Sequence, residues 1–77
     1  MNNKVKFLEI IMSDLLSNRD TLEMELNRII NDDKSNVITK KMDFLKILDD
    51  VSTTNNKISL LGEYMGSIVT TDNNNNK

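Results

Sequence analysis

The sequence predicts an all-α protein built as an antiparallel helical hairpin, the basic unit of a coiled-coil bundle. Apolar residues recur at alternating intervals of three and four in two separate segments, which is the repeat of a helix that packs on another helix. Proline, the strongest helix breaker, is absent from all 77 residues. One polar segment at residues 31–36 separates the two periodic segments, so the second helix can fold back beside the first.

The first helix is predicted over residues 4–31. Its stripe repeats at intervals of three and four residues and contains one charged residue, Arg19. The apolar members of this stripe are Val5, Leu8, Met12, Leu15, Leu22, Leu26 and Ile29. Asp20 followed by Glu23 has the pattern of a helix-capping box, which would break the helix there. Because the apolar repeat continues in phase across this segment, we expect one continuous helix.

Residues 32–36 form the predicted loop, and Ser35 or Asn36 can cap the helix that follows. We expect this second helix over residues 37–69. One set of its positions recurs every seven residues, namely Val37, Phe44, Val51, Ile58 and Met65. We assign the interleaved positions of the same stripe to Lys41, Leu48, Asn55, Gly62 and Val69. The second stripe is therefore more polar than the first.

The segment at residues 52–56 consists of serine, threonine and asparagine, which are poor helix formers. A break there would divide the second helix and give a compact three-helix bundle. Because the seven-residue spacing continues across the segment, we expect one long or gently bent helix, and the three-helix bundle is the alternative. The chain is then a single helical domain over residues 1–70. The tail at residues 71–77 has no apolar residue and is expected to be disordered.

The chain has more large apolar residues than a hairpin can cover. At least eleven of them lie outside the two predicted stripes, and each one left in water forgoes about 1.5–3 kcal/mol of burial. These eleven are Phe7, Ile10, Ile11, Leu16, Met24, Ile38, Leu45, Ile47, Leu60, Leu61 and Ile68. We therefore expect the helices to pack on helices of a partner, either a second copy or another subunit. The expected partner interface is the apolar stripe of the first helix together with Phe44, Leu48, Val51, Ile58, Leu61 and Met65.

Two polar residues interrupt the stripes and are candidates for fixing register or partner choice, Arg19 and Asn55. If the chain folds back around residues 33–34, Arg19 lies beside Asp49 or Asp50 and can pair with one of them. The alternative is that the alkyl stem of Arg19 follows the surface and carries its guanidinium to water.

Gly62 and Gly66 lie four residues apart, on one face of the predicted second helix. Glycine within a helix costs about 1 kcal/mol relative to alanine. A close approach by another helix would explain this spacing, and the alternative is that Gly66 helps to end the helix.

The composition argues against several classes of function. Histidine and cysteine are absent, so we expect no zinc, haem or iron–sulfur site, no disulfide and no nucleophilic catalysis. We expect neither an enzyme, nor a cofactor, nor a small-molecule substrate. The net charge is −2 without a basic run, which argues against nucleic acid as a partner. No segment approaches the ~20 apolar residues of a membrane-spanning helix, so an intracellular location, cytoplasmic or nuclear, is expected.

The function expected from these features is a non-catalytic protein–protein interaction module. It would be a small coiled-coil subunit that oligomerises or scaffolds a multi-subunit helical complex. The alternative is a small helical regulator, of the kind that phages and viruses encode, which binds and inhibits one enzyme or transcription factor. A subunit of a bundle is unstable alone, whereas a regulator is stable alone and exposes one compact apolar patch.

Overall fold

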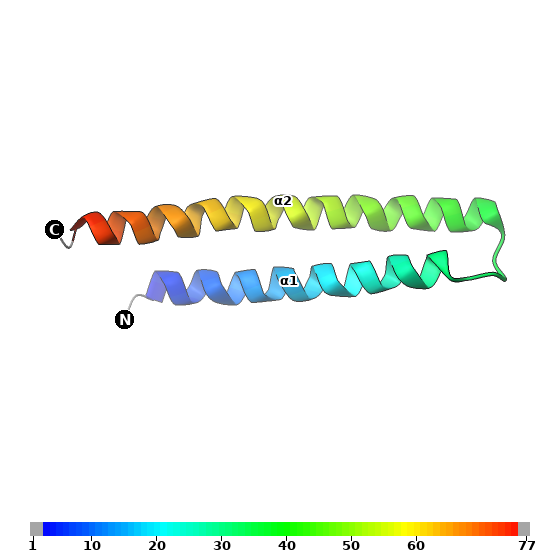
Figure 1. Cartoon of the computed structure of the whole chain (residues 1–77), viewed down its shortest axis with the longest axis horizontal. Coiled ribbons are helices and arrows are strands. Elements are labelled where there is room, and N and C mark those ends of the chain that lie inside the picture. Colours follow the sequence, from blue (N-terminus) through cyan, green and yellow to red (C-terminus); the bar gives the residue numbers. More distant parts are fainter. Residues whose placement is uncertain (1–2, 76–77) are drawn as a thin grey trace.

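The structure, a computed structural model, is a hairpin of two long helices (Figure 1). It describes the backbone of residues 3–75 and the side chains of residues 3–68. Helix α1 (Asn3–Ile30) and helix α2 (Val37–Asn75) run antiparallel beside each other and are joined by a short loop at one end. The prediction of an all-α helical hairpin is confirmed, and the three-helix alternative is wrong because α2 continues through residues 52–56.

Both helices continue across the segments where a break was considered. Helix α1 passes through Asp20, and its bounds differ from the predicted 4–31 by one residue at each end. In α2, each serine, threonine or asparagine lowers helix stability by at most about 0.7 kcal/mol relative to alanine. Thr54 offsets part of this cost, because it is buried against α1 with 5% of its surface exposed.

The C-terminal end of α2 differs from the prediction. We expected the helix to end near residue 69 and a disordered tail from residue 71, but the helical backbone continues to Asn75. Gly66 does not end the helix, because no glycine has the positive φ angle of a helix C-cap. The run of threonine and asparagine that follows contains no proline to stop the helix. Residues 76 and 77 of the predicted tail lie outside the described residues.

The two helices meet along one stripe of each. On α1, Arg19 and all seven apolar members of the predicted stripe are half-buried or buried. On α2, the side chains in the corresponding positions are Lys40, Phe44, Ile47, Val51, Thr54, Ile58, Leu61, Met65 and Ile68. The predicted stripe of the first helix is therefore the face that packs on the second helix of the same chain.

The prediction of the second stripe was wrong for its interleaved positions, which we placed one residue too far along the chain. The interleaved positions are Lys40, Ile47, Thr54, Leu61 and Ile68, each one residue before the position that we assigned. Both choices keep a seven-residue repeat, but adjacent residues on a helix point about 100° apart. As a result Leu48 and Gly62 lie outside the contact between the helices, and Leu48 is 41% exposed. The side chain of Val69 lies outside the described residues.

The hairpin is long and has almost no interior. Its principal dimensions are 61 × 17 × 13 Å, and its radius of gyration is 17.8 Å, against about 11.5 Å for a compact domain of this length. Among the described side chains, Ile29 at 6% and Thr54 at 5% exposure are the two that count as buried. A single layer of two helices covers each stripe from one direction only, so the flanks of the stripe stay in water.

The loop is organised by Asp32 and Asn36. The carboxylate of Asp32 accepts hydrogen bonds from the backbone N–H groups of Lys34 (2.9 Å) and Ser35 (3.3 Å) and from the Ser35 hydroxyl. Lys40 Nζ of α2 donates to the Asp32 carbonyl oxygen. Asn36 Oδ1 accepts from the backbone N–H of Ile38 at 2.7 Å, so Asn36 is the predicted N-cap of α2.

Removing this cap should destabilise the hairpin. We expect Asn36→Ala to lower the free energy of unfolding by about 1 kcal/mol, because the N–H of Ile38 loses its acceptor. Asn36→Asp keeps an acceptor and should stay near the stability of the parent chain. Urea unfolding followed by circular dichroism at one fixed protein concentration measures both variants. Equal stabilities of the alanine and aspartate variants would contradict the role of Asn36 as a cap.

The loop also predicts a dependence of stability on pH. Hydrogen bonds from the Ser35 hydroxyl and the Lys34 backbone N–H lower the pKa of Asp32 below its ordinary 3.8. A pKa that is lower in the folded than in the unfolded state means that the ionised carboxylate stabilises the fold above the ordinary carboxyl pKa. This contribution is lost as the pH falls through the folded-state value.

We therefore expect Asp32→Asn to be less stable than the parent chain at neutral pH and to lose less stability on acidification. Unfolding curves from pH 7 down to about pH 2 measure this difference. Asp33→Asn, one residue away in the same loop, is the matched control. A parallel acid response of the Asp32 variant and the parent chain would show that Asp32 does not stabilise the loop through its charge.

Candidate protein interaction surface

A polar layer crosses the middle of the contact between the helices. It consists of Asn18 and Arg19 from α1 and Thr54 and Asn55 from α2. Asn18 Nδ2 donates to Thr54 Oγ1, and an Arg19 guanidinium N–H donates to Asn55 Oδ1, both at 3.4 Å. These hydrogen bonds are long and therefore weak. The layer lies between two apolar stretches of the same interface, one toward the loop and one toward the chain termini.

The proposed pairing of Arg19 with Asp49 or Asp50 is wrong, because Arg19 donates to Asn55. The pair of Asn18 with Thr54 centres the hairpin on residue 36, whereas our prediction assumed residues 33–34. The reason is that the first turns of α2 extend past the end of α1 on the loop side (Figure 1). Val37, the first residue of α2, is accordingly 78% exposed.

Arg19 combines an exposed end with a buried stem. Its guanidinium reaches Asn55, which is exposed, while its Nε atom is buried and has no hydrogen-bond partner among the described residues. A buried polar atom without a partner costs about 1–3 kcal/mol. Polar groups at such positions can fix the register of two helices at the expense of stability, and for Arg19 and Asn55 this role remains a prediction.

The second feature is an apolar patch at the loop end of the hairpin. Six large apolar residues here are between 41% and 78% exposed. They form the loop-end patch: Ile30, Val37, Ile38, Met42, Leu45 and Leu48. Ile38, Met42 and Leu45 lie one turn apart along α2, and Leu48 continues the same row.

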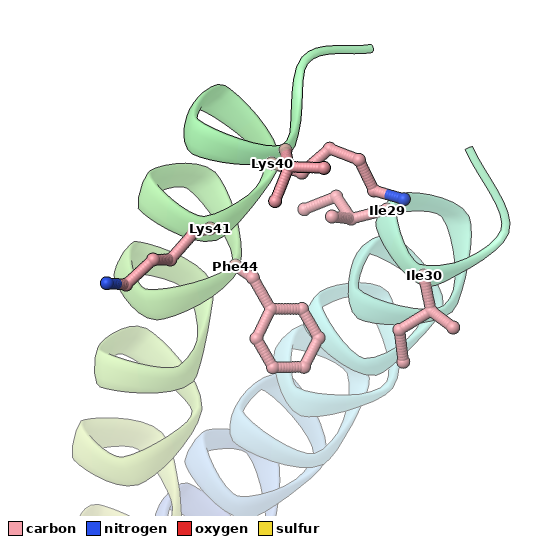
Figure 2. A pocket seen from close by; sticks show the side chains of 6 residues that line it. Ile29, Ile30, Lys40, Lys41 and Phe44 are labelled. Carbon is pink, nitrogen blue, oxygen red and sulfur yellow. The ribbon is translucent and has the colours of Figure 1, made fainter. Parts of the chain in front are cut away.

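A hollow of about 340 Å³ adjoins this patch at the loop end of the two helices. It is lined by Ile29, Ile30, Val37, Lys40, Lys41 and Phe44. In Figure 2 the ring of Phe44 lies between the two helices, while the ammonium group of Lys41 points away from them. The hollow is therefore open to solvent and lined mainly by apolar side chains, and two lysines, Lys40 and Lys41, lie at its edge.

The opposite side of the same end of the hairpin is charged. Glu25 and Arg28 of α1 form an ion pair there, and the hydrogen bond from Arg28 lowers the pKa of Glu25. Together with Asp43, Lys46 and Asp50 of α2, this ion pair lines a second hollow, separate from the apolar one. Both signs of charge occur on this side, whereas the loop-end patch is apolar.

The two glycines do not make a close contact within the hairpin. A Cβ atom added at Gly62 or Gly66 would meet no described atom within 4 Å. The close helix contact that we expected at these residues is therefore not between α1 and α2. It remains a prediction for the packing of α2 against another chain.

Sequence reasoning identified part of this surface. Ile38 and Leu45 were among the apolar residues outside the stripes, and Leu48 was assigned to the partner interface. Met42 and Ile30 were not counted among those residues. Further exposed apolar side chains lie away from the patch, namely Phe7, Ile10, Leu16, Met24, Leu60 and Tyr64.

Other kinds of site find little support among the described residues. They contain no group of three or more acidic, histidine or cysteine side chains that could hold a metal ion. They also contain no helix that is long and apolar enough to cross a membrane. No protein-family model matches the chain, and no curated protein or solved structure shows significant similarity to it.

The polar layer yields a stability prediction. We expect Arg19→Leu to raise the free energy of unfolding by about 1–3 kcal/mol, because the substitution removes a buried atom without a partner and extends the apolar stripe. Arg28→Leu, which removes an arginine from the exposed ion pair with Glu25, should leave stability nearly unchanged. Chemical denaturation of the two variants provides the comparison. A loss of stability in Arg19→Leu would mean that the hydrogen bond of Arg19 to Asn55 stabilises the hairpin by more than the buried Nε atom destabilises it.

Proposed function

We propose that the chain is a non-catalytic subunit of a helical bundle, and that it packs the loop-end patch against further helices. One observation carries this proposal, namely a hairpin that leaves large apolar side chains in water, six of them gathered in the loop-end patch. The patch consists of neighbouring rows on α2 extended by Ile30 of α1, so one incoming helix could cover it. Contiguous exposed apolar surface of this kind is typical of protein interaction sites.

The total surface supports the proposal quantitatively. The accessible surface of the hairpin is 6173 Å² for a mass of 8.8 kDa. A compact monomer of this mass would expose about 4,800 Å², so the hairpin exposes roughly 1,400 Å² more than a folded domain of its size. A standard protein–protein interface covers about 800 Å² of each partner. Association with other helices would therefore bring the exposed surface toward the usual value.

The stability of small folds supports it as well. A chain of this length can bury only a small core, and many such chains are stabilised by disulfides. This chain contains no cysteine and therefore has no disulfide. Here the core is a half-covered stripe interrupted by Arg19. We infer that folding of the hairpin is coupled to its association.

The regulator hypothesis is the second candidate, and the number of exposed apolar side chains argues against it. A regulator that is stable alone needs one compact apolar patch. In this chain, exposed apolar residues also occur outside the loop-end patch, on both helices.

Sedimentation equilibrium with circular dichroism over a dilution series tests the proposal. We expect helicity to fall on dilution, because the isolated hairpin does not cover its apolar surface. In Leu45→Lys, a charge in the loop-end patch should weaken association by at least about tenfold, which corresponds to 1.4 kcal/mol.

Leu60→Lys is the matched control. Leu60 lies on the same helix and is 57% exposed, against 53% for Leu45, but it is not part of the patch. Its substitution should leave association nearly unchanged. A fully helical and stable monomer at all concentrations would overturn the proposal and favour the regulator hypothesis.

A further inference from the structure

The side of α2 that carries the loop-end patch has a stripe of its own. Its positions again alternate at intervals of three and four, and they are Ile38, Lys41, Leu45, Leu48, Ser52, Asn55, Ser59, Gly62 and Gly66. Lys41, Leu48, Asn55 and Gly62 are the interleaved positions that our sequence prediction placed in the contact with α1. In the structure every member of this stripe is exposed. Helix α2 thus has one stripe that packs on α1 and a second stripe that is exposed along its whole length, although Asn55 in this second stripe accepts a hydrogen bond from Arg19 of α1.

The second stripe changes character at its middle. On the loop side of Ser52 it has three large apolar residues and Lys41, and beyond Ser52 it has asparagine, serine and two glycines. Large side chains in one half thus match small side chains in the other half. A surface with this property is complementary to itself when a second copy is turned end for end, as in a two-fold symmetric dimer.

We propose that the second stripe of α2 binds a second copy of this chain, with the two α2 helices antiparallel about a two-fold axis between Ser52 and Asn55. This inference rests on the proposed function and names the partner. It predicts a symmetric dimer of hairpins, in which Leu45 and Leu48 of each loop-end patch lie against the small half of the other copy.

The pairing follows from the helical repeat. In the hairpin itself, the two kinds of stripe position face each other across the antiparallel contact, because the hydrogen bonds Asn18–Thr54 and Arg19–Asn55 place the stripe residues Arg19 and Thr54 at the same level. The same rule applied to the second stripe places Leu45 opposite Gly62 of the partner and Leu48 opposite Ser59 of the partner. The space that a Cβ atom would occupy at Gly62 and Gly66 is open, so a partner's large side chain has room there. Close approach of helices at small residues is a recurrent packing mode.

Charge agrees with the antiparallel direction. Lys41 lies opposite Gly66 of the partner, one helical turn from Glu63 of the partner, so two opposite-charge pairs form in each dimer. Among the described residues, neither Lys41 nor Glu63 has an ion-pair partner within the chain. A parallel arrangement would place Lys41 near Lys41 and Gly62 near Gly62, which repels at one end and leaves a gap at the other. The excess surface of roughly 1,400 Å² per chain is enough for such an interface.

Charge reversal tests the pairing. Lys41→Glu and Glu63→Lys should each raise the dissociation constant of the dimer roughly tenfold, because each creates two like-charge pairs. The double variant restores opposite charges and should return close to the affinity of the parent chain. Lys57→Glu has the same change in net charge as Lys41→Glu and lies on α2 outside the stripe, so it should have little effect. Additive losses in the double variant would overturn the pairing.

Gly62→Leu separates the proposed contact from a structural role of the glycine. Leucine is a far better helix former than glycine, so helicity at equal protein concentration should not fall because of the helix itself. In the dimer, however, the new side chain would collide with Leu45 of the partner and raise the dissociation constant at least about tenfold. Ser67→Leu, outside the stripe, is the control. Unchanged dimerisation of Gly62→Leu would overturn the contact.

Spin labels measure the direction of the helices. The chain has no cysteine, so Thr53→Cys and Thr39→Cys each provide one labelling site, and both residues are exposed on the same face of α2. In the antiparallel dimer the labels at residue 53 should lie about 20 Å apart, near two helix diameters. The labels at residue 39 should lie about 48 Å apart, because 29 residues separate their levels along the helix axis in addition to the same lateral distance.

The outcomes distinguish this inference from the proposed function. Short distances at both sites mean a parallel dimer, and they overturn the antiparallel pairing while association itself stands. A chain that stays monomeric and largely unfolded at every concentration overturns the second copy as partner, and the proposed function then requires a different helical partner. A stable helical monomer overturns both.

Discussion

The whole structure depends on one constraint, which is that two helices can cover each other along a single stripe only. The stripe residues of α1 and α2 meet from one direction, and their flanks stay in contact with water. Half-burial is consequently the rule even for leucine and isoleucine at the centre of the contact, and Ile29 is the one apolar side chain among those described that is buried. The exposed apolar rows on α2 follow from the same geometry, because the described part of the chain has no third helix to cover them.

The polar layer at the middle of the contact shows what this interface gives up in stability. Arg19 occupies a position where leucine would continue the stripe, and its Nε atom is buried without a partner among the described residues. A shifted register would move the guanidinium away from Asn55 and place it against apolar side chains. The layer therefore favours one register of the two helices, because the other registers are destabilised by a charged group against apolar side chains. This is the usual effect of a polar residue in a coiled-coil seam.

The hairpin could be predicted from the sequence because its strongest signals are local. The stripe of α1, the absence of proline and the polar loop each depend on residues close together in the chain. The partner of Arg19 could not be predicted in the same way, because the register depends on how far α2 extends past the loop. The choice between Leu48 and Ile47 failed for a related reason. Adjacent positions share the same repeat, and the contact with α1 decides between them.

The composition of α2 makes its dependence on packing stronger than that of α1. Alanine, the best helix former, is absent from the chain, and both glycines lie in the second half of α2. Most of the stability of a helix in a protein comes from packing of its apolar face, and an isolated helix of weak formers is marginal in water. In α2 the face toward α1 is half-buried, and the stripe beside it is exposed. The second half of α2 should thus gain the most order from any helix that covers this stripe.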